Sequence, residues 1–251
     1  MPLRESTEAS LGIPRQNYPL AALLTLMGAS LLALPLLPSI PQPQSYHRFA
    51  DQRALLGIAN FWNVVSSLVF IPIGIVGLWR FRRDAAVTVL FLGVFLTGFG
   101  SAFYHLDPND GTMFWDRLPM SLTFAAILAV LVEERVSARA GAILLWPLIA
   151  LAVFSLLLWR WTDDLRLYGW VQFFPCLAVP LLLVVLPARY TGTSWWIVMA
   201  ALYVLAKLLE FYDGTIYAAG HILSGHALKH LAAAAGCVAI LRHFQTRRPI
   251  P

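Results

Sequence analysis

The amino-acid sequence predicts an all-α fold, a polytopic bundle of membrane-spanning helices. Hydrophobic residues make up 59% of the 251 residues and charged residues only 12%, about half the charged fraction of an ordinary soluble domain. The mean hydropathy is +0.70. Long apolar runs without a polar face alternate with short polar connectors. Such runs are typical of helices in lipid, because a soluble helix needs a polar stripe to face water.

Eight apolar segments have lengths suited to crossing a bilayer. They are residues 19–39, 57–79, 85–107, 115–132, 141–159, 169–187, 194–217 and 220–242. Pro38 to Pro43 and the run Asp107 to Gly111 are strong breakers between segments. We expect the first segment to be a retained anchor rather than a signal peptide. The stretch before it is long and carries Glu5 and Glu8, and no small-residue cleavage site follows it.

The Lys and Arg residues of the connectors are unequally divided. Eleven lie on the side that carries both termini and four on the other side, so both termini are expected to be cytoplasmic. The net charge of +5 does not indicate nucleic-acid binding, because these residues form no continuous basic face. Cys176 and Cys237 each lie within an apolar run. Neither a disulfide nor a cysteine-ligated metal is therefore expected.

Ionisable residues inside membrane segments are costly and mark functional candidates. His105 ends the third segment and Asp116 opens the fourth, with a tight turn between them. The two residues are nearly equidistant from the turn, so we expect them to face each other just inside the non-cytoplasmic surface.

The last segment adds His226 and His230, whose i, i+4 spacing places both imidazoles on one helix face. That segment enters from the same side, so its first turns should lie at the depth of His105. An HxxxH pair alone is more often structural. A third histidine and an aspartate at matching depth favour a metal, and three imidazoles with an open position suit catalytic zinc. His221 lies off this face and is expected at the interface.

Ser101 precedes His105 by one turn and shares its face. A buried hydroxyl often bonds only to its own helix. The glycines at positions 98 and 100, however, would let a substrate or a neighbouring helix approach. We therefore favour a substrate or oxyanion contact for Ser101.

The remaining polar residues of these segments are expected to be structural. Lys207, Glu210 and Asp213 share a face of the seventh segment and should form an ion-pair network with Lys229. Asn63, Ser66 and Ser67 are expected to join helices through hydrogen bonds. A supporting contact to a histidine ligand is the alternative for these three.

Four motifs together resemble the alkaline ceramidase family. They are NFWNVVS at 60–66, GSAFYH at 100–105, DRLPM at 116–120 and SGHALKH at 224–230. The wider membrane hydrolase superfamily, which includes adiponectin-receptor-like proteins, shares the Ser, His, Asp and HxxxH set. The family has a seven-helix core, so the resemblance implies such a core plus one extra N-terminal transmembrane helix, residues 19–39.

The resemblance implies a zinc-dependent amide hydrolase that releases a fatty acid and a sphingoid base from ceramide. His105, His226 and His230 match its zinc ligands. Asp116 would orient or deprotonate the zinc-bound water, and Ser101 would steady the developing oxyanion. The principal alternative is a receptor-like or signalling membrane protein with a structural zinc. A transporter is less favoured, because neither repeats nor broken mid-membrane helices are evident.

Calcium is the one departure from the family pattern. Eukaryotic members bind Ca²⁺ through an acidic segment and a glutamate at the start of the first core helix. Between positions 40 and 60 this chain has only Asp51 as an acidic residue, and Asn60 stands in place of the glutamate. The case for Ca²⁺ is therefore weak.

These observations predict the organisation of the chain. Residues 1–56 would hold a cytoplasmic tail, the extra helix and a non-cytoplasmic loop; residues 57–243 the hydrolase core; and residues 244–251 a second cytoplasmic tail. We expect a multi-pass protein of the bacterial inner membrane with its zinc site towards the non-cytoplasmic face. The expected partner is a membrane lipid, ceramide or another N-acyl lipid, with no nucleic acid. The oligomeric state stays open.

Overall fold

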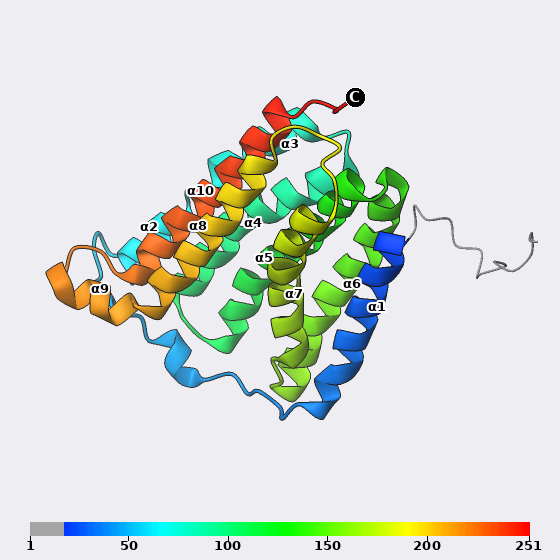
Figure 1. Ribbon diagram of the computed structural model, residues 1–251. Coiled ribbons are helices and arrows are strands. Elements are labelled where there is room, and N and C mark those ends of the chain that lie inside the picture. Colours follow the sequence, from blue (N-terminus) through cyan, green and yellow to red (C-terminus); the bar gives the residue numbers. More distant parts are fainter. Residues whose placement is uncertain (1–17) are drawn as a thin grey trace, which may run out of the picture.

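The computed structural model describes residues 18–251, and over this range the chain is a bundle of helices (Figure 1). The helices are α1 Tyr18–Ala33, the 3-10 turns η2 Leu34–Leu36 and η3 Gln44–His47, α2 Phe61–Ser67, α3 Phe70–Phe81, α4 Ala85–Leu106, α5 Asp110–Arg135, α6 Ala138–Thr162, α7 Arg166–Val185, α8 Thr193–Phe211, α9 Asp213–Gly220 and α10 Gly225–Thr246. Two isolated bridges are the only β pairing within residues 18–251. The all-α prediction is confirmed. The tail expected before α1 lies outside the described residues.

Seven helical stretches are long and apolar enough to cross a membrane: Tyr18–Leu36, Phe61–Phe81, Ala85–Leu106, Asp110–Arg135, Ala138–Thr162, Arg166–Val185 and Thr193–Phe211. The last expected segment, α10, is not among them, because histidine, lysine and arginine side chains lower its hydropathy. Its 22 residues nevertheless span about 33 Å, at 1.5 Å per residue, and it lies beside α8 (Figure 1). A multi-pass membrane bundle follows.

The start of α5 differs from the sequence expectation. The fourth segment was expected to begin at 115, yet the helix begins at Asp110. Asn109 is the reason, because its side-chain oxygen accepts hydrogen bonds from the N–H groups of Gly111 and Thr112 at 2.9 and 3.1 Å. The Thr112 hydroxyl accepts in return from the Asn109 N–H at 3.2 Å, completing a capping box. Asp116 therefore lies inside the helix rather than at its opening.

Two other expected segments are interrupted. The 57–79 run is broken between α2 and α3, and the 194–217 run is broken at Tyr212 between α8 and α9. The second break places Asp213 at the start of a short helix, beyond the end of α8. The expectation that Asp213 shares one continuous helical face with Lys207 and Glu210 is therefore wrong.

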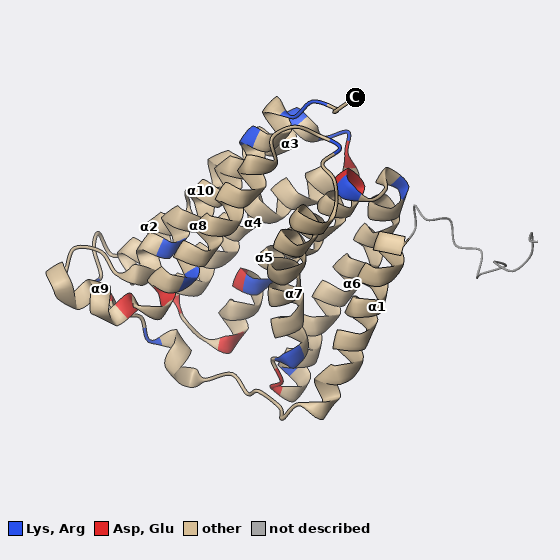
Figure 2. Cartoon of the chain, in the orientation of Figure 1, with Lys and Arg blue, Asp and Glu red and all other residues tan. Residues whose placement is uncertain are grey.

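Helices α4 and α5 form the centre of the bundle, and α1 lies at its edge (Figure 1). Only Leu23 and Met27 of α1 are buried, and the Trp170 indole donates to the Ser30 hydroxyl at 2.9 Å. This peripheral position is compatible with the expectation that the first helix is an addition to a seven-helix core. The described N-terminal end of α1 and the C-terminus lie towards the same end of the bundle. Most Lys and Arg positions gather there as well (Figure 2).

A buried polar cluster ties the helices together at this end. The Glu134 carboxylate accepts from the Trp196 indole at 3.0 Å and from His243 Nε2 at 2.8 Å. It also pairs with Arg247. The cluster joins α5, α8 and α10 and thereby fixes how α10 runs back towards the opposite end, where the three histidines lie.

Candidate metal centre

Helices α4 and α10 bring the three candidate histidines together. His105 lies in the last turn of α4, and His226 and His230 lie in the first two turns of α10. The Ser224 hydroxyl caps α10 by accepting from the Ala227 N–H at 3.2 Å. One ring nitrogen of each histidine lies within 4.8 Å of the others. The expected convergence of the three histidines is present in the structure.

The spacing of these nitrogens fits a metal centre. His105 Nε2 and His230 Nε2 are 3.4 Å apart. Two nitrogens held about 2.0–2.1 Å from one tetrahedral ion would be separated by about 3.3–3.4 Å. The three side chains are only 1%, 5% and 6% exposed for His105, His226 and His230. The cluster is thus a buried imidazole group in which the His105–His230 pair has the separation that a tetrahedral ion requires.

Hydrogen bonding leaves nitrogens free to bind an ion. The Ser66 hydroxyl lies 2.8 Å from His230 Nδ1 and donates to the Asn63 carbonyl at 3.2 Å. In the tautomer with a proton on Nδ1, His230 donates to Ser66, and its Nε2 keeps a free lone pair. Among residues 18–251, His226 Nε2 is buried without a hydrogen-bond partner. These residues could hold a metal ion, and imidazoles favour zinc and other transition metals over magnesium or calcium.

Asp116 and Ser101 lie beside one another across the contact of α4 with α5. Gly100 permits this closeness, because a Cβ there would lie 2.1 Å from the Trp115 carbonyl oxygen and 3.4 Å from the Asp116 nitrogen. A neighbouring helix, not a substrate, therefore approaches this glycine. Ser101 follows Gly100 on α4 and therefore lies at the same helix contact as Asp116. Asp116 Oδ1 is buried and has no hydrogen-bond partner in the described part of the chain, so it is free to accept a proton or a hydrogen bond.

Ser67, which was expected to join helices or to support a histidine ligand, lies between α4 and α10 at the site. Its hydroxyl oxygen lies 3.1 Å from that of Ser101, 2.7 Å from the Asn63 carbonyl oxygen and 3.5 Å from His230 Nδ1. Together with Ser66 it links α2 to both α4 and α10. Asn63 contributes its backbone carbonyl to these bonds, and its side chain donates to the Asp51 carbonyl at 3.3 Å.

Residues 40–53, which we call the strap, run across the end of the bundle that holds the histidines (Figure 1). Phe49, in the strap, is 4% exposed, and its ring centroid lies 4.8 Å from that of His105 and 4.6 Å from that of His226. Sequence reasoning missed this cover. The only available signal was the presence of Tyr46 and Phe49 in a connector that was otherwise polar.

Polar contacts tie the strap to several helices. The Gln42 side chain accepts from Arg117 at 2.8 Å, and His47 Nε2 lies 3.1 Å from Asp110 Oδ1. The Tyr46 hydroxyl donates to Glu210 at 2.8 Å. The strap thus closes the site from the water at that end of the bundle.

Glu210 forms the centre of the ion pairs between α8 and α10. Lys207 and Lys229 both pair with its carboxylate. Lys229 therefore points to α8 and away from the histidine cluster, although it lies between His226 and His230 in sequence. Asp213 takes no part in these ion pairs and contacts backbone N–H groups instead.

Asp51 is already engaged by a cation of the chain itself. Arg53 donates from Nε and Nη2 to the two Asp51 oxygens at 2.8 and 2.7 Å. These hydrogen bonds lower the pKa of Asp51. Both carboxylate oxygens of the sole acidic residue between positions 40 and 60 therefore have a partner, and the weak case for calcium gains no support.

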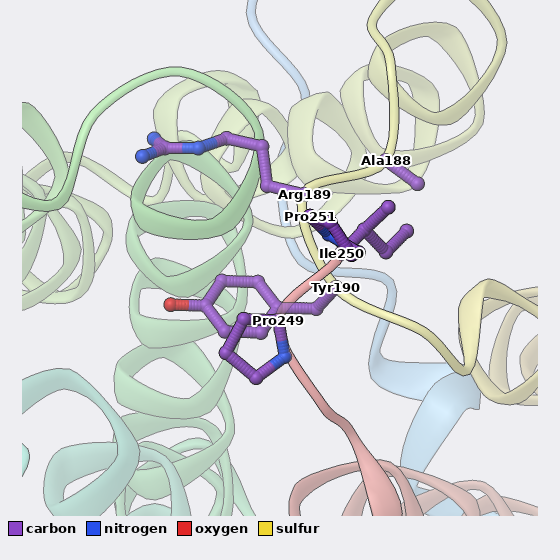
Figure 3. Close-up of a pocket in the computed structure, with 6 residues that line it drawn as sticks. All are labelled: Ala188, Arg189, Tyr190, Pro249, Ile250 and Pro251. Carbon is purple, nitrogen blue, oxygen red and sulfur yellow. The ribbon is translucent and has the colours of Figure 1, made fainter.

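The C-terminal tail folds back on the connector between α7 and α8. The Thr191 N–H donates to the Arg248 carbonyl and the Ile250 N–H to the Arg189 carbonyl, each at 2.9 Å. A hollow of about 300 Å³ lies here (Figure 3). It is lined by Ala188, Arg189, Tyr190, Pro249, Ile250 and Pro251. It contains none of the candidate catalytic residues and lies at the end of the bundle away from the histidines.

Comparison with known proteins places this geometry in a family. The family model described as Ceramidase matches residues 53–248, a range that includes His105, His226, His230, Asp116 and Ser101. A comparison with curated proteins gave no match. The family match covers most of the chain and confirms the resemblance seen in its motifs. The chain belongs to the Ceramidase family.

Proposed function

We propose that the chain is a zinc-dependent amide hydrolase that cleaves the N-acyl bond of ceramide or of a similar N-acyl lipid. The observation that carries this proposal is the buried group of three imidazoles, whose nitrogens converge within 4.8 Å. When bound, zinc would polarise the amide carbonyl and lower the pKa of a water molecule to about 7. Family membership supports a ceramide-hydrolysing enzyme.

Asp116 is the residue proposed to move the proton. Hydrolysis adds the water oxygen to the carbonyl carbon, breaks the carbon–nitrogen bond and transfers a proton to the departing amine. Asp116 Oδ1 is buried and has no partner among the residues that the structure describes, so it can accept the proton of the attacking water and later deliver it to nitrogen. Ser101, beside it, would donate to the carbonyl oxygen as negative charge develops there.

The surroundings of the site suit a lipid substrate. The strap and Phe49 cover the site from water, and large apolar side chains are exposed on the outer faces of the helices. On α4 these include Phe99, Phe103 and Leu106. An acyl chain in the bilayer would meet such surfaces at no cost in apolar exposure. The outer faces therefore favour a substrate that arrives from the membrane.

The composition of the centre argues against a structural zinc in a receptor-like protein. Structural zinc is usually closed by four protein ligands. Within residues 18–251, the group that could hold a metal consists of His105, His226 and His230, with no further His, Cys, Asp or Glu. An open fourth position is the arrangement of a catalytic ion.

The proposed location is a bacterial inner membrane, with both termini in the cytoplasm and the zinc site towards the other face. The unequal division of Lys and Arg residues supports this orientation. The described N-terminal end of α1 and the C-terminus lie towards one end of the bundle, as the orientation requires (Figure 1).

Hydrolysis of a labelled ceramide by the purified protein tests the function. Activity should disappear with a chelator and return with added zinc, and His226→Ala should lack both zinc and activity. His221→Asn is the matched control, because His221 is exposed, lies outside the cluster and has φ 51°, which asparagine tolerates. A zinc-loaded protein that cleaves neither ceramide nor other N-acyl lipids would favour the receptor-like alternative. Unchanged zinc in His226→Ala would refute the ligand set.

A further inference from the structure

We infer that Asp213 is a positioning residue that holds a metal-ligand helix and the covering strap in one register. Its carboxylate has two oxygens, and each accepts a different backbone N–H. Oδ1 accepts from His226 at 2.7 Å, and Oδ2 accepts from Ala50 at 2.9 Å. One side chain therefore contacts the backbone of a candidate ligand and the backbone next to Phe49. The inference rests on the proposed metal centre.

The contact with His226 gives its backbone N–H a hydrogen-bond acceptor that the helix itself cannot supply. His226 lies in the first turn of α10, where backbone N–H groups have no partner within the helix. Ser224 satisfies the N–H of Ala227, which leaves that of His226 to Asp213. A carboxylate at this end also interacts favourably with the helix dipole.

Gly225 makes this contact geometrically feasible. A Cβ at this position would lie 2.1 Å from the Leu209 carbonyl oxygen and 2.8 Å from the Asp213 Cα. Only glycine therefore lets the start of α10 approach the junction of α8 and α9 this closely. The break at Tyr212 is equally necessary, because it turns Asp213 away from the end of α8.

The contact with Ala50 positions the part of the strap that covers the site. Phe49 precedes Ala50 and packs on His105 and His226, with ring centroids 4.8 and 4.6 Å away. Anchoring the Ala50 N–H therefore holds the Phe49 ring over the cluster. Asp213 thus acts on the metal centre in two ways: it fixes the backbone of one ligand, and it keeps the cover in place.

These two actions have separate readouts. Loss of the His226 contact should weaken zinc binding at equilibrium, because removing a residue that supports a metal ligand typically lowers metal affinity by about 10–100-fold. Loss of the Ala50 contact should speed zinc release, because the cover is loosened. A purely structural residue would alter thermal unfolding but neither of these zinc measurements.

The experiment titrates the zinc-loaded, full-length protein with a chelator and measures retained zinc and its release rate. Asp213→Ala should bind zinc about 10–100-fold more weakly than the parent and release it faster. Asp163→Gly is the control, because Asp163 also accepts a strap N–H, that of Gln42 at 3.0 Å. Glycine suits its φ of 55°. This control should leave the zinc affinity unchanged.

Asp213→Asn keeps the test decisive if the alanine variant does not fold. An amide has one acceptor oxygen and can keep only one of the two bonds, so either affinity or release rate must change. An asparagine or alanine variant that matches the parent in both would overturn the inference. A parent that binds no zinc would instead refute the proposed function itself, so the two failures are distinguishable.

Discussion

Replacement of Asp116 by asparagine separates catalysis from metal binding. Asparagine keeps the size of the side chain and one acceptor oxygen, but it loses the charge needed to take a proton from water. Asp116 Oδ1 has no hydrogen-bond partner within residues 18–251, so little packing or bonding energy is lost with the charge. The carboxylate is also not a member of the histidine group that could hold the ion. Zinc content should therefore stay near that of the parent.

The expected loss of activity follows from the role of a general base. Removing such a base costs about 10²- to 10⁴-fold in rate, or about 3–5 kcal/mol in activation free energy. The assay measures zinc content and labelled-ceramide hydrolysis on the same preparation. Asp107→Asn is the control, because Asp107 is an exposed aspartate in the turn before α5. Full zinc with parental activity would refute the base assignment. Loss of zinc together with activity would make Asp116 a ligand or a support for one.

Two further predictions concern orientation and acid stability. In a background without Cys176 and Cys237, Asp107→Cys should react with an impermeant thiol reagent only from the non-cytoplasmic side. Arg83→Cys, at the other end of α4, should react only from the cytoplasm, and the opposite pattern would reverse the orientation. The pKa of Asp51 is lowered by its hydrogen bonds from Arg53, so the pair stabilises the fold above the unfolded-state pKa of about 3.9. That contribution is lost as pH falls through the lower folded-state value. Arg53→Gln should therefore lower the unfolding temperature at pH 6 but not near pH 2; an equal difference at both would contradict this reasoning.

The sequence alone determined the membrane-bundle fold and the convergence of the three histidines. The apolar runs require helices that satisfy their own backbone groups in lipid. Alternating passage of those helices then places the end of α4 and the start of α10 at the same end of the bundle. The spacing of His226 and His230 needs only the helical repeat to bring both to one face. These properties follow from local periodicity and segment length, which can be read directly from a sequence.

Only the tertiary structure decided which polar groups meet. Asp213 appeared to belong to an ion-pair face with Lys207 and Glu210, but a break at Tyr212 directs it to the backbone of His226 and Ala50. Phe49 lies in a connector whose path no periodicity specifies, yet it covers the histidines. Helix breaks and loop paths depend on contacts between residues far apart in the chain. Local spacing therefore predicts the ligands, while packing alone determines their cover and support.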